Sequence, residues 1–256
     1  MRLGLVTYMM AADWDLDTII QKCQMLGFEG VELRTTHAHG VEVTLDQSQR
    51  QEVRKRFQDS DVVLWGLGTT CEYDSPDKTE VEENIRLTKE FIKLAADVGA
   101  VGVKVRPNKL HEKEGIPREK TLEQIGLAYR QCGIFAQDFG IELWMEVHGS
   151  GTSEPKCIHT IMEVADHNNC FVCWNSNLTD RDEQGSIKSN FELLQKWIRS
   201  CHINELANKE YPWRELFGLL HQAGYGERFT LAEIQGSSDP ERVLKYYRAL
   251  WEELTH

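Results

Sequence analysis

Short apolar or alternating segments recur along the chain, and each is followed by a longer segment with helical spacing of its apolar positions. Such short runs are typical of β-strands. We expect eight strands, at about residues 3–8, 30–34, 62–67, 101–106, 141–147, 170–175, 200–204 and 229–234. Four helical segments end in a glycine before the next strand, as helix C-caps do: Gly27, Gly99, Gly140 and Gly224. The last helical segment offers Ser238 and Glu241 at capping-box spacing.

The regular alternation of strand and helix predicts a parallel sheet in the α/β class. Eight such units in 256 residues indicate one (β/α)8 TIM barrel that spans residues 1–256 as a single domain, because barrels of this kind use about 250 residues. An open doubly wound sheet is the rival, but no GxGxxG motif follows the first strand.

Composition and charge restrict the partners. With 29 Lys and Arg against 41 Asp and Glu, the net charge is −12, which argues against a nucleic acid, whose phosphates are bound by basic residues. No segment approaches the roughly 18 apolar residues of a membrane span, and the first residues lack the features of a secretory signal. We therefore expect no membrane partner and a cytoplasmic location. The seven scattered cysteines, including the Cys170–Cys173 pair, favour buried, reduced thiols.

Polar side chains stand at the ends of the last four predicted strands. Glu146, Asn175, His202 and Glu233 follow one another at separations of 29, 27 and 31 residues, close to one βα unit each. Any one of them alone would be better explained as a strand cap. Since the strand ends of a TIM barrel meet at one mouth, the four together favour a site for one divalent ion, with Mn²⁺, Co²⁺, Mg²⁺ and Zn²⁺ all compatible.

Strand parity places further charges inside the barrel, where they need a partner or a ligand. Lys104 and Arg106 share the inward face of the fourth strand. Both are candidates for substrate binding. For Lys104 a buried ion pair with Glu32 or Glu142 is slightly favoured, whereas Arg106 lies nearer the mouth and is expected to face a ligand.

Two histidines near the mouth are also candidates for substrate binding. His148 shares the parity of Glu146 and should lie just above it. A loop-capping role is equally compatible with that position. His39 lies with His37 in the loop after the second strand, where a solvated loop pair is the alternative.

The segments EVHG, CWNSN, CHINE and FTLAE around the four strand-end residues, with FEGVELRTTHAHG on the second strand, resemble the xylose isomerase-like TIM barrels. This superfamily includes sugar and sugar phosphate isomerases and epimerases, inosose dehydratases and AP endonucleases. The resemblance implies that Glu146 and Glu233 bind the metal and move protons as catalytic residues, with His202 as a further ligand. Asn175 stands where the family usually has Asp, which removes one negative charge from the metal site.

The resemblance therefore implies a divalent-metal-dependent isomerase or epimerase for a small carbohydrate: a sugar, sugar phosphate or polyol. Thr152 and Leu178 replace a Glu and a His of the ketose 3-epimerases, which disfavours that particular activity. A metal-dependent lyase or dehydratase on a keto-sugar or inositol derivative stays open, as does a sugar-binding barrel without turnover. A DNA-repair endonuclease is disfavoured by the acidic charge. A homo-oligomer also stays open, because such barrels often associate.

Overall fold

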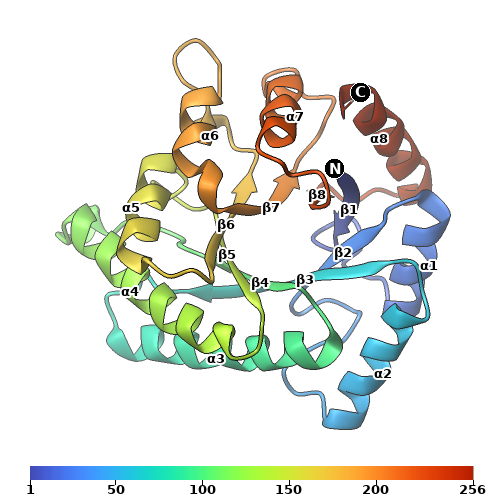
Figure 1. Cartoon of the computed structure of the whole chain (residues 1–256), viewed down its shortest axis with the longest axis horizontal. Coiled ribbons are helices and arrows are strands. Elements are labelled where there is room, and N and C mark those ends of the chain that lie inside the picture. The colour runs from blue at the N-terminus through green and yellow to red at the C-terminus, as the bar shows by residue number, and fades with distance from the viewer. Residues whose placement is uncertain (256) are drawn as a thin grey trace.

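The chain forms one closed barrel of eight parallel strands with an outer ring of helices (Figure 1). The structure is a computed structural model that describes residues 1–255. The strands are β1 (Arg2–Val6), β2 (Gly30–Arg34), β3 (Val63–Glu72), β4 (Gly102–Arg106), β5 (Glu142–Glu146), β6 (Cys170–Asn175), β7 (Ile198–Ile203) and β8 (Phe229–Ala232). Pairing of β1 with β8 closes the barrel and confirms the predicted fold.

A helix follows every strand and covers the outside of the barrel. The α-helices are α1 (Leu16–Leu26), α2 (Gln47–Gln58), α3 (Lys78–Val98), α4 (Arg118–Gln137), α5 (Pro155–Ala165), α6 (Lys188–Leu194), α7 (Trp213–Gln222) and α8 (Pro240–Thr255). Short 3-10 helices are η1 (Glu112–Glu114), η2 (Leu178–Asp180) and η3 (Gln195–Trp197). The apolar faces of the α-helices pack against the strands in one large core.

Element boundaries follow the local signals with a few shifts. The predicted β2 and β6 agree with the structure, whereas β3 continues to Glu72 and β8 already ends at Ala232. Gly27 and Gly99 cap α1 and α3 in the left-handed conformation, with φ of 73° and 83°, which glycine adopts without the steric cost of a side chain.

The capping box predicted at the start of α8 is wrong. The backbone N–H of Arg242 donates to the side chain of Asp239 at 3.3 Å. Asp239, which directly precedes Pro240 at the first helical position, therefore takes the N-cap role that we expected of Ser238.

Aromatic side chains fill the lower part of the barrel interior, toward the N-terminal ends of the strands. The ring centroids of Trp65 and Trp144 lie 5.3 Å apart, and those of Trp65 and Phe229 lie 5.1 Å apart. A Cβ at Gly66 or Gly102 would come within 2.6 or 2.3 Å of the Trp144 indole. These two glycines therefore make room for the large ring in the barrel core.

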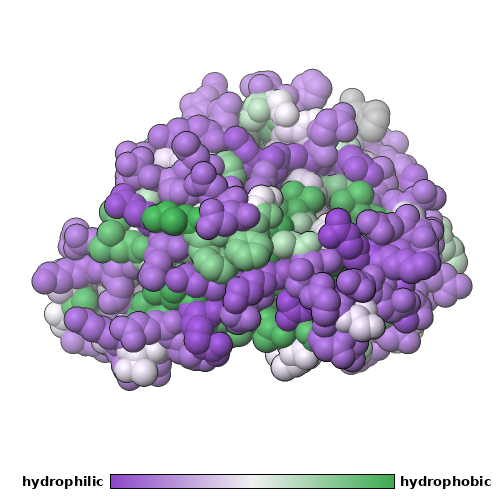
Figure 2. Space-filling view, turned by 60° about the horizontal axis from the view of Figure 1, so that its bottom comes forward, coloured by the Kyte–Doolittle hydropathy of each residue, from purple (hydrophilic) through white to green (hydrophobic). Residues whose placement is uncertain are grey.

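The described chain contains all seven cysteines as buried, free thiols, in agreement with the prediction of reduced cysteines. None of its helices is both long enough and apolar enough to cross a membrane. The face shown in Figure 2 is mostly hydrophilic, with groups of hydrophobic residues visible between the hydrophilic ones.

Candidate metal centre and substrate pocket

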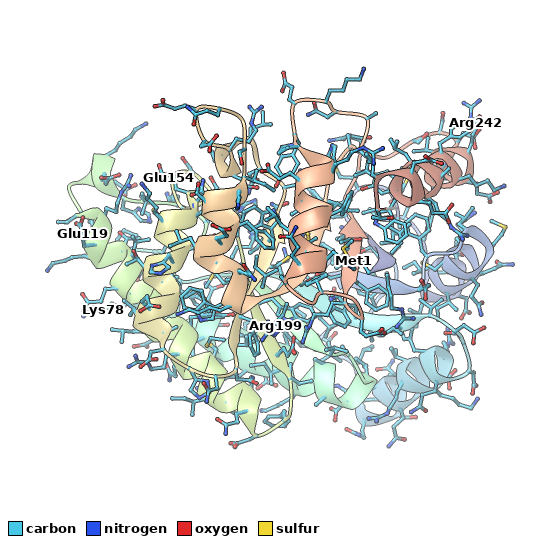
Figure 3. The ribbon with its side chains drawn as sticks, turned by 45° about the horizontal axis from the view of Figure 1, so that its top comes forward. Met1, Lys78, Glu119, Glu154, Arg199 and Arg242 are labelled. Carbon is cyan, nitrogen blue, oxygen red and sulfur yellow. The ribbon has the colours of Figure 1, made fainter. Side chains whose placement is uncertain are left out.

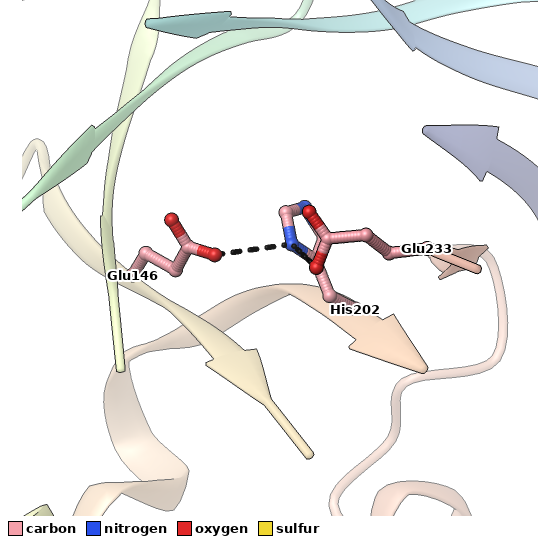
Figure 4. A group of neighbouring side chains, drawn as sticks. All are labelled: Glu146, His202 and Glu233. Atoms are coloured by element: carbon pink, nitrogen blue, oxygen red, sulfur yellow. Dashed lines mark ion pairs between the residues drawn. The ribbon is translucent and has the colours of Figure 1, made fainter. Parts of the chain in front are cut away.

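Three of the predicted ligands meet at the C-terminal mouth of the barrel. Glu146 ends β5, His202 lies near the end of β7, and Glu233 follows β8 directly. One ligand atom from each lies within 4.8 Å of the others. The Nδ1 atom of His202 lies 3.4 Å from Glu146 Oε1 and 3.5 Å from Glu233 Oε2. Figure 4 shows the two carboxylates reaching His202 from opposite sides.

The orientation of the His202 ring is held from behind by Glu32 of β2. The Nε2 atom of His202 lies 3.2 Å from Glu32 Oε2, and both side chains are fully buried. This contact assigns the proton of a neutral imidazole to Nε2 and leaves the Nδ1 lone pair for the site. Gly68 of β3 gives the Glu32 carboxylate its space, because a Cβ there would lie 2.6 Å from Glu32 Oε1.

Asn175, at the end of β6, lies directly beside this cluster. Its Nδ2 atom donates to Glu146 Oε1 at 3.3 Å. Asn175 Oδ1 and His202 Nδ1 are buried, and neither has a hydrogen-bond partner within residues 1–255. Buried polar atoms without partners are costly and need an explanation. Two carboxylates, an imidazole nitrogen and an amide oxygen form a donor set that fits a divalent ion.

Lys104 is bonded to one of the candidate ligands. Its Nζ atom lies 2.7 Å from Glu146 Oε2, and both side chains are almost completely buried. The expected pair of Lys104 with Glu32 or Glu142 is therefore wrong as to the partner. Glu142 begins β5 at the opposite end of the barrel, where its two carboxylate oxygens accept from Arg228 at 2.8 and 2.9 Å.

The buried charges shift one another's titration. Burial by itself would raise the pKa of Glu146, but the positive charges of Lys104 and His202 lower it well below its ordinary value. For His202 burial would lower the pKa, and the nearby Cys173, Glu32 and Glu233 raise it well above the ordinary value instead. Glu146 is thus held as a carboxylate. The His202 ring is held as the positively charged imidazolium in the metal-free protein at neutral pH, so an ion would displace the proton on Nδ1.

A cavity of about 290 Å³ opens above the cluster and includes several other predicted residues. Arg106, Lys104 and His148 line it together with Glu146, Asn175 and Glu233. The Nδ1 atom of His148 is buried and has no hydrogen-bond partner in the described chain. Burial lowers the pKa of His148, so its imidazole is neutral at neutral pH. The cavity therefore combines acidic, basic and neutral polar groups around one small volume.

His39 does not line this cavity. Its Nε2 atom lies 2.8 Å from the Arg34 carbonyl oxygen, and its Nδ1 accepts from the Val41 N–H at 3.0 Å. Both ring nitrogens are thus taken by the backbone. His39 instead borders a larger cavity of about 720 Å³ between α1 and α2, which contains none of the four candidate ligands. The structure gives no support to His39 as a substrate-binding residue.

Sequence reasoning assigned no role to four other residues that line the cavity: Tyr8, Arg34, Asn177 and Asn204. Arg34 has the same strand parity as Glu32, which places it on the inner face of β2. That signal was available in the sequence. The other three lie one or two residues beyond the ends of β1, β6 and β7. Tyr8, Asn177 and Asn204 have the same parity as Val6, Asn175 and His202, so the same signal was available for them.

The fold and this cluster together define the protein as a (β/α)8 barrel with a carboxylate–imidazole centre at its mouth. A model of the xylose isomerase-like TIM barrel family matches residues 20–253. The chain therefore belongs to the xylose isomerase-like TIM barrel family. No curated protein matches the sequence.

Several solved structures share the fold. An L-ribulose 3-epimerase aligns with a TM-score of 0.81 and 15% identity over 99% of this chain and 94% of its own. The IolI protein with a binding zinc atom aligns at 0.78 and 14% identity, over 100% of this chain and 98% of its own. A probable 3-DHS dehydratase, AsbF of Bacillus anthracis, aligns at 0.73 and 14% identity over 98% of this chain and 99% of its own.

Proposed function

We propose that the protein is a divalent-metal-dependent isomerase or epimerase that acts on a small sugar, sugar phosphate or polyol derivative. The observation that carries this proposal is the convergence of Glu146, His202 and Glu233 within 4.8 Å at the barrel mouth. Family membership supports it, because epimerases are built on the same barrel. The cavity of about 290 Å³ suits a ligand no larger than a small sugar.

In this proposal Glu146, His202 and Glu233 hold the ion, and Asn175 contributes its free Oδ1 atom. A bound divalent ion would polarise a carbonyl or hydroxyl oxygen of the substrate. Lys104 would balance part of the negative charge of the site, because its Nζ atom lies 2.7 Å from Glu146 Oε2. Oε2 of Glu146 is thereby bonded to Lys104, and Oε1, which lies 3.4 Å from His202 Nδ1, would be the oxygen that holds the ion.

The environments of the two carboxylates suggest different roles in proton transfer. Glu146 is tightly paired with Lys104 and its pKa is well below the ordinary value, which makes it the weaker base. The Glu233 side chain is 17% exposed and has no ion pair with a lysine or arginine among the described residues. Glu233 is therefore the group that removes a proton from the substrate carbon. Glu146 lies across the cluster but is held as a carboxylate, so the proton that epimerisation returns from that side would come from the Lys104 ammonium bonded to Glu146 Oε2. Exchange with solvent would then restore Lys104 and Glu233 to their starting states.

A lyase or dehydratase reaction is the second candidate, and His148 is the observation that favours it. Its neutral imidazole lines the cavity, and within residues 1–255 its Nδ1 atom has no partner. Loss of a hydroxyl group after proton removal needs a proton donor on the leaving oxygen. The free Nδ1 atom of His148 would accept the proton that Glu233 removes and then pass it to that oxygen. The fold shared with a probable 3-DHS dehydratase is compatible with this reaction.

Proton removal is common to both reactions, so the test measures that step directly. Purified protein loaded with Mn²⁺, Co²⁺ or Zn²⁺ is incubated in D₂O with a panel of ketoses, sugar phosphates, sugar acids and keto-inositols. We expect deuterium to enter one carbon next to a carbonyl, as measured by NMR, and Glu233→Gln to abolish the exchange. Epimer formation then marks the first reaction and release of water the second.

Elemental analysis accompanies the exchange assay. Metal bound near one equivalent, and lost in His202→Ala and Glu146→Gln, supports the centre. A protein that binds none of the three ions and catalyses no exchange contradicts the proposal. Tight binding of a sugar without exchange would identify a sugar-binding barrel instead.

A further inference from the structure

Two arginines stand at the ends of neighbouring even-numbered strands and line the same cavity. Arg34 is the last residue of β2, and Arg106 is the last residue of β4. Both border the cavity that contains Glu146 and Glu233, which come from β5 and from the end of β8. The cavity therefore has basic side chains from β2 and β4 and acidic side chains from β5 and from the end of β8.

The guanidinium of Arg34 has no acidic partner. Within residues 1–255 no carboxylate oxygen lies within 4.0 Å of its nitrogens, and the one hydrogen bond of its guanidinium is to the Thr35 carbonyl oxygen at 3.3 Å. Its Cζ atom lies over the Tyr8 ring, 5.8 Å from the centroid. Arg34 is thus held in place at the cavity with its donors largely unused.

Arg106 is only partly satisfied. It forms an ion pair with Glu72 of β3, but its Nε atom is buried and has no hydrogen-bond partner in the described chain. Burial lowers the pKa of Arg34, and the positive charge of Arg106 lowers it further. The two guanidinium groups therefore repel each other inside a half-buried pocket, and an anion bound between them would remove this cost.

We propose that Arg34 and Arg106 form an anion subsite, and that the substrate of the barrel-mouth centre is a sugar or polyol derivative with a carboxylate or phosphate group. Guanidinium groups bind both kinds of anion through paired hydrogen bonds. The anionic end lies against β2 and β4, and the reacting carbon lies against Glu233. The sugar part of this inference rests on the proposed function, whereas the anion subsite rests on the two arginines alone.

The test uses three matched probes: glycerol, glycerate and glycerol 3-phosphate, which differ in their charged group. Binding is measured by calorimetry to the protein as purified and again after chelator treatment. At least one anionic probe is expected to bind tenfold or more tightly than glycerol, and Arg34→Gln to weaken that binding about tenfold or more. Preference for glycerate indicates a sugar acid as substrate, and preference for glycerol 3-phosphate indicates a sugar phosphate.

Two further variants make the result specific. Arg242→Gln removes an exposed arginine on α8, far out on the helical ring (Figure 3), and should leave anion binding unchanged. Arg34→Lys keeps the positive charge but lacks the paired donors of the planar guanidinium. Its anion affinity should therefore lie between those of wild type and Arg34→Gln. Circular dichroism checks that each variant is folded.

Equal binding of glycerol and both anions overturns the subsite, and so does anion binding that Arg34→Gln leaves intact. The latter result would place the anion at the metal. Failure of the exchange assay with preserved, Arg34-dependent anion binding would instead contradict the proposed reaction and leave the subsite standing.

Discussion

The barrel interior has two layers that differ in almost every physical property. The lower layer contains Trp65, Trp144 and Phe229, whose rings stack or tilt against one another. Both indole N–H groups in this layer donate hydrogen bonds, one to Ser200 and one to Glu142. The layer above it contains Glu32, Lys104, Glu146 and His202, all buried and all ionisable. The same strand alternation points both layers inward.

The difference shows where stability and chemistry are separated in this fold. Burial of large aromatic surface stabilises the lower layer without any ligand. In the upper layer Glu32 Oε1 and His202 Nδ1 are buried without a hydrogen-bond partner among the described residues. Removing charges from water is expensive even when they are paired. Such an arrangement is unfavourable for a core and useful for holding a ligand.

The sharpest test of this separation is Glu233→Gln, which should damage function and spare stability. We expect the rate of substrate deuterium exchange to fall by about 10²–10⁴-fold, the contribution of a positioned acid–base group. The free energy of unfolding, measured with urea, should change by about 1 kcal/mol or less, because the side chain is partly exposed. Glu205→Gln, an exposed carboxylate beyond β7, is the control. Unchanged exchange in Glu233→Gln would remove it from the proposed mechanism.

The reverse experiment is Trp144→Ala in the lower layer. The indole fills the space over Gly66 and Gly102, so its loss should lower the free energy of unfolding by about 3–5 kcal/mol. The metal Kd of the folded protein should stay within about threefold. Trp197→Ala, at a partly buried surface position, should have a smaller effect. Loss of metal binding by a Trp144→Ala protein that is still folded would show that the two layers are coupled.

A smaller effect is expected from Glu32→Gln, which changes the group behind His202. Because Glu32 holds Nε2 of the imidazole, the variant should weaken metal binding by about 10–100-fold. Competition with a chromogenic chelator measures the Kd, and the ¹⁵N shifts of His202 report the tautomer. Glu29→Gln, an exposed neighbour paired with Arg2, should not alter either. Equal Kd values for wild type and Glu32→Gln would contradict the orienting role.

The smallest predicted effect is a pH dependence set by His202. Its pKa in the folded, metal-free protein is raised: burial opposes this, but Cys173, Glu32 and Glu233 outweigh burial. An ion must displace the His202 proton, so affinity should rise about tenfold per pH unit until pH reaches the folded pKa. Calorimetry in buffers of different ionisation heat should detect about one proton released at pH 7, and none in His202→Gln.

The stability of the metal-free protein should change with pH in the direction opposite to the metal affinity. A raised pKa contributes stability that is fully present below the unfolded value of about 6.5 and is lost as pH rises through the folded pKa. Urea unfolding at several pH values, in wild type and His202→Gln, separates this contribution from that of other groups. A wild-type stability that increases over this pH range relative to the variant would contradict the raised pKa.

Local patterns in the sequence were sufficient for the architecture. Apolar alternation located all eight strands, and glycines such as Gly27 and Gly99 marked helix ends where only a left-handed residue fits. Errors were confined to boundaries: Asp239, not Ser238, takes the N-cap role at α8. Neighbouring polar residues can each serve as the N-cap of a helix. Which of them does so depends on the direction in which the chain enters the helix from the preceding loop.

For the site, the sequence by itself determined which strand-end residues point toward the mouth, because parity and a repeat of one βα unit are local quantities. Glu146, His202 and Glu233 meet as those quantities predict. The partners were decided only in three dimensions. Lys104 bonds to Glu146 across β4 and β5, and Glu32 reaches His202 across the barrel, 170 positions away in the chain.

The physical reason is that strand alternation fixes only the direction of a side chain, whereas pairing depends on its height along the barrel axis. Strand stagger and the missing side chain at Gly68 set those heights. They bring Glu32 beside His202, send Glu142 to Arg228 at the other end, and leave Arg34 at the mouth without an acidic partner among the residues described.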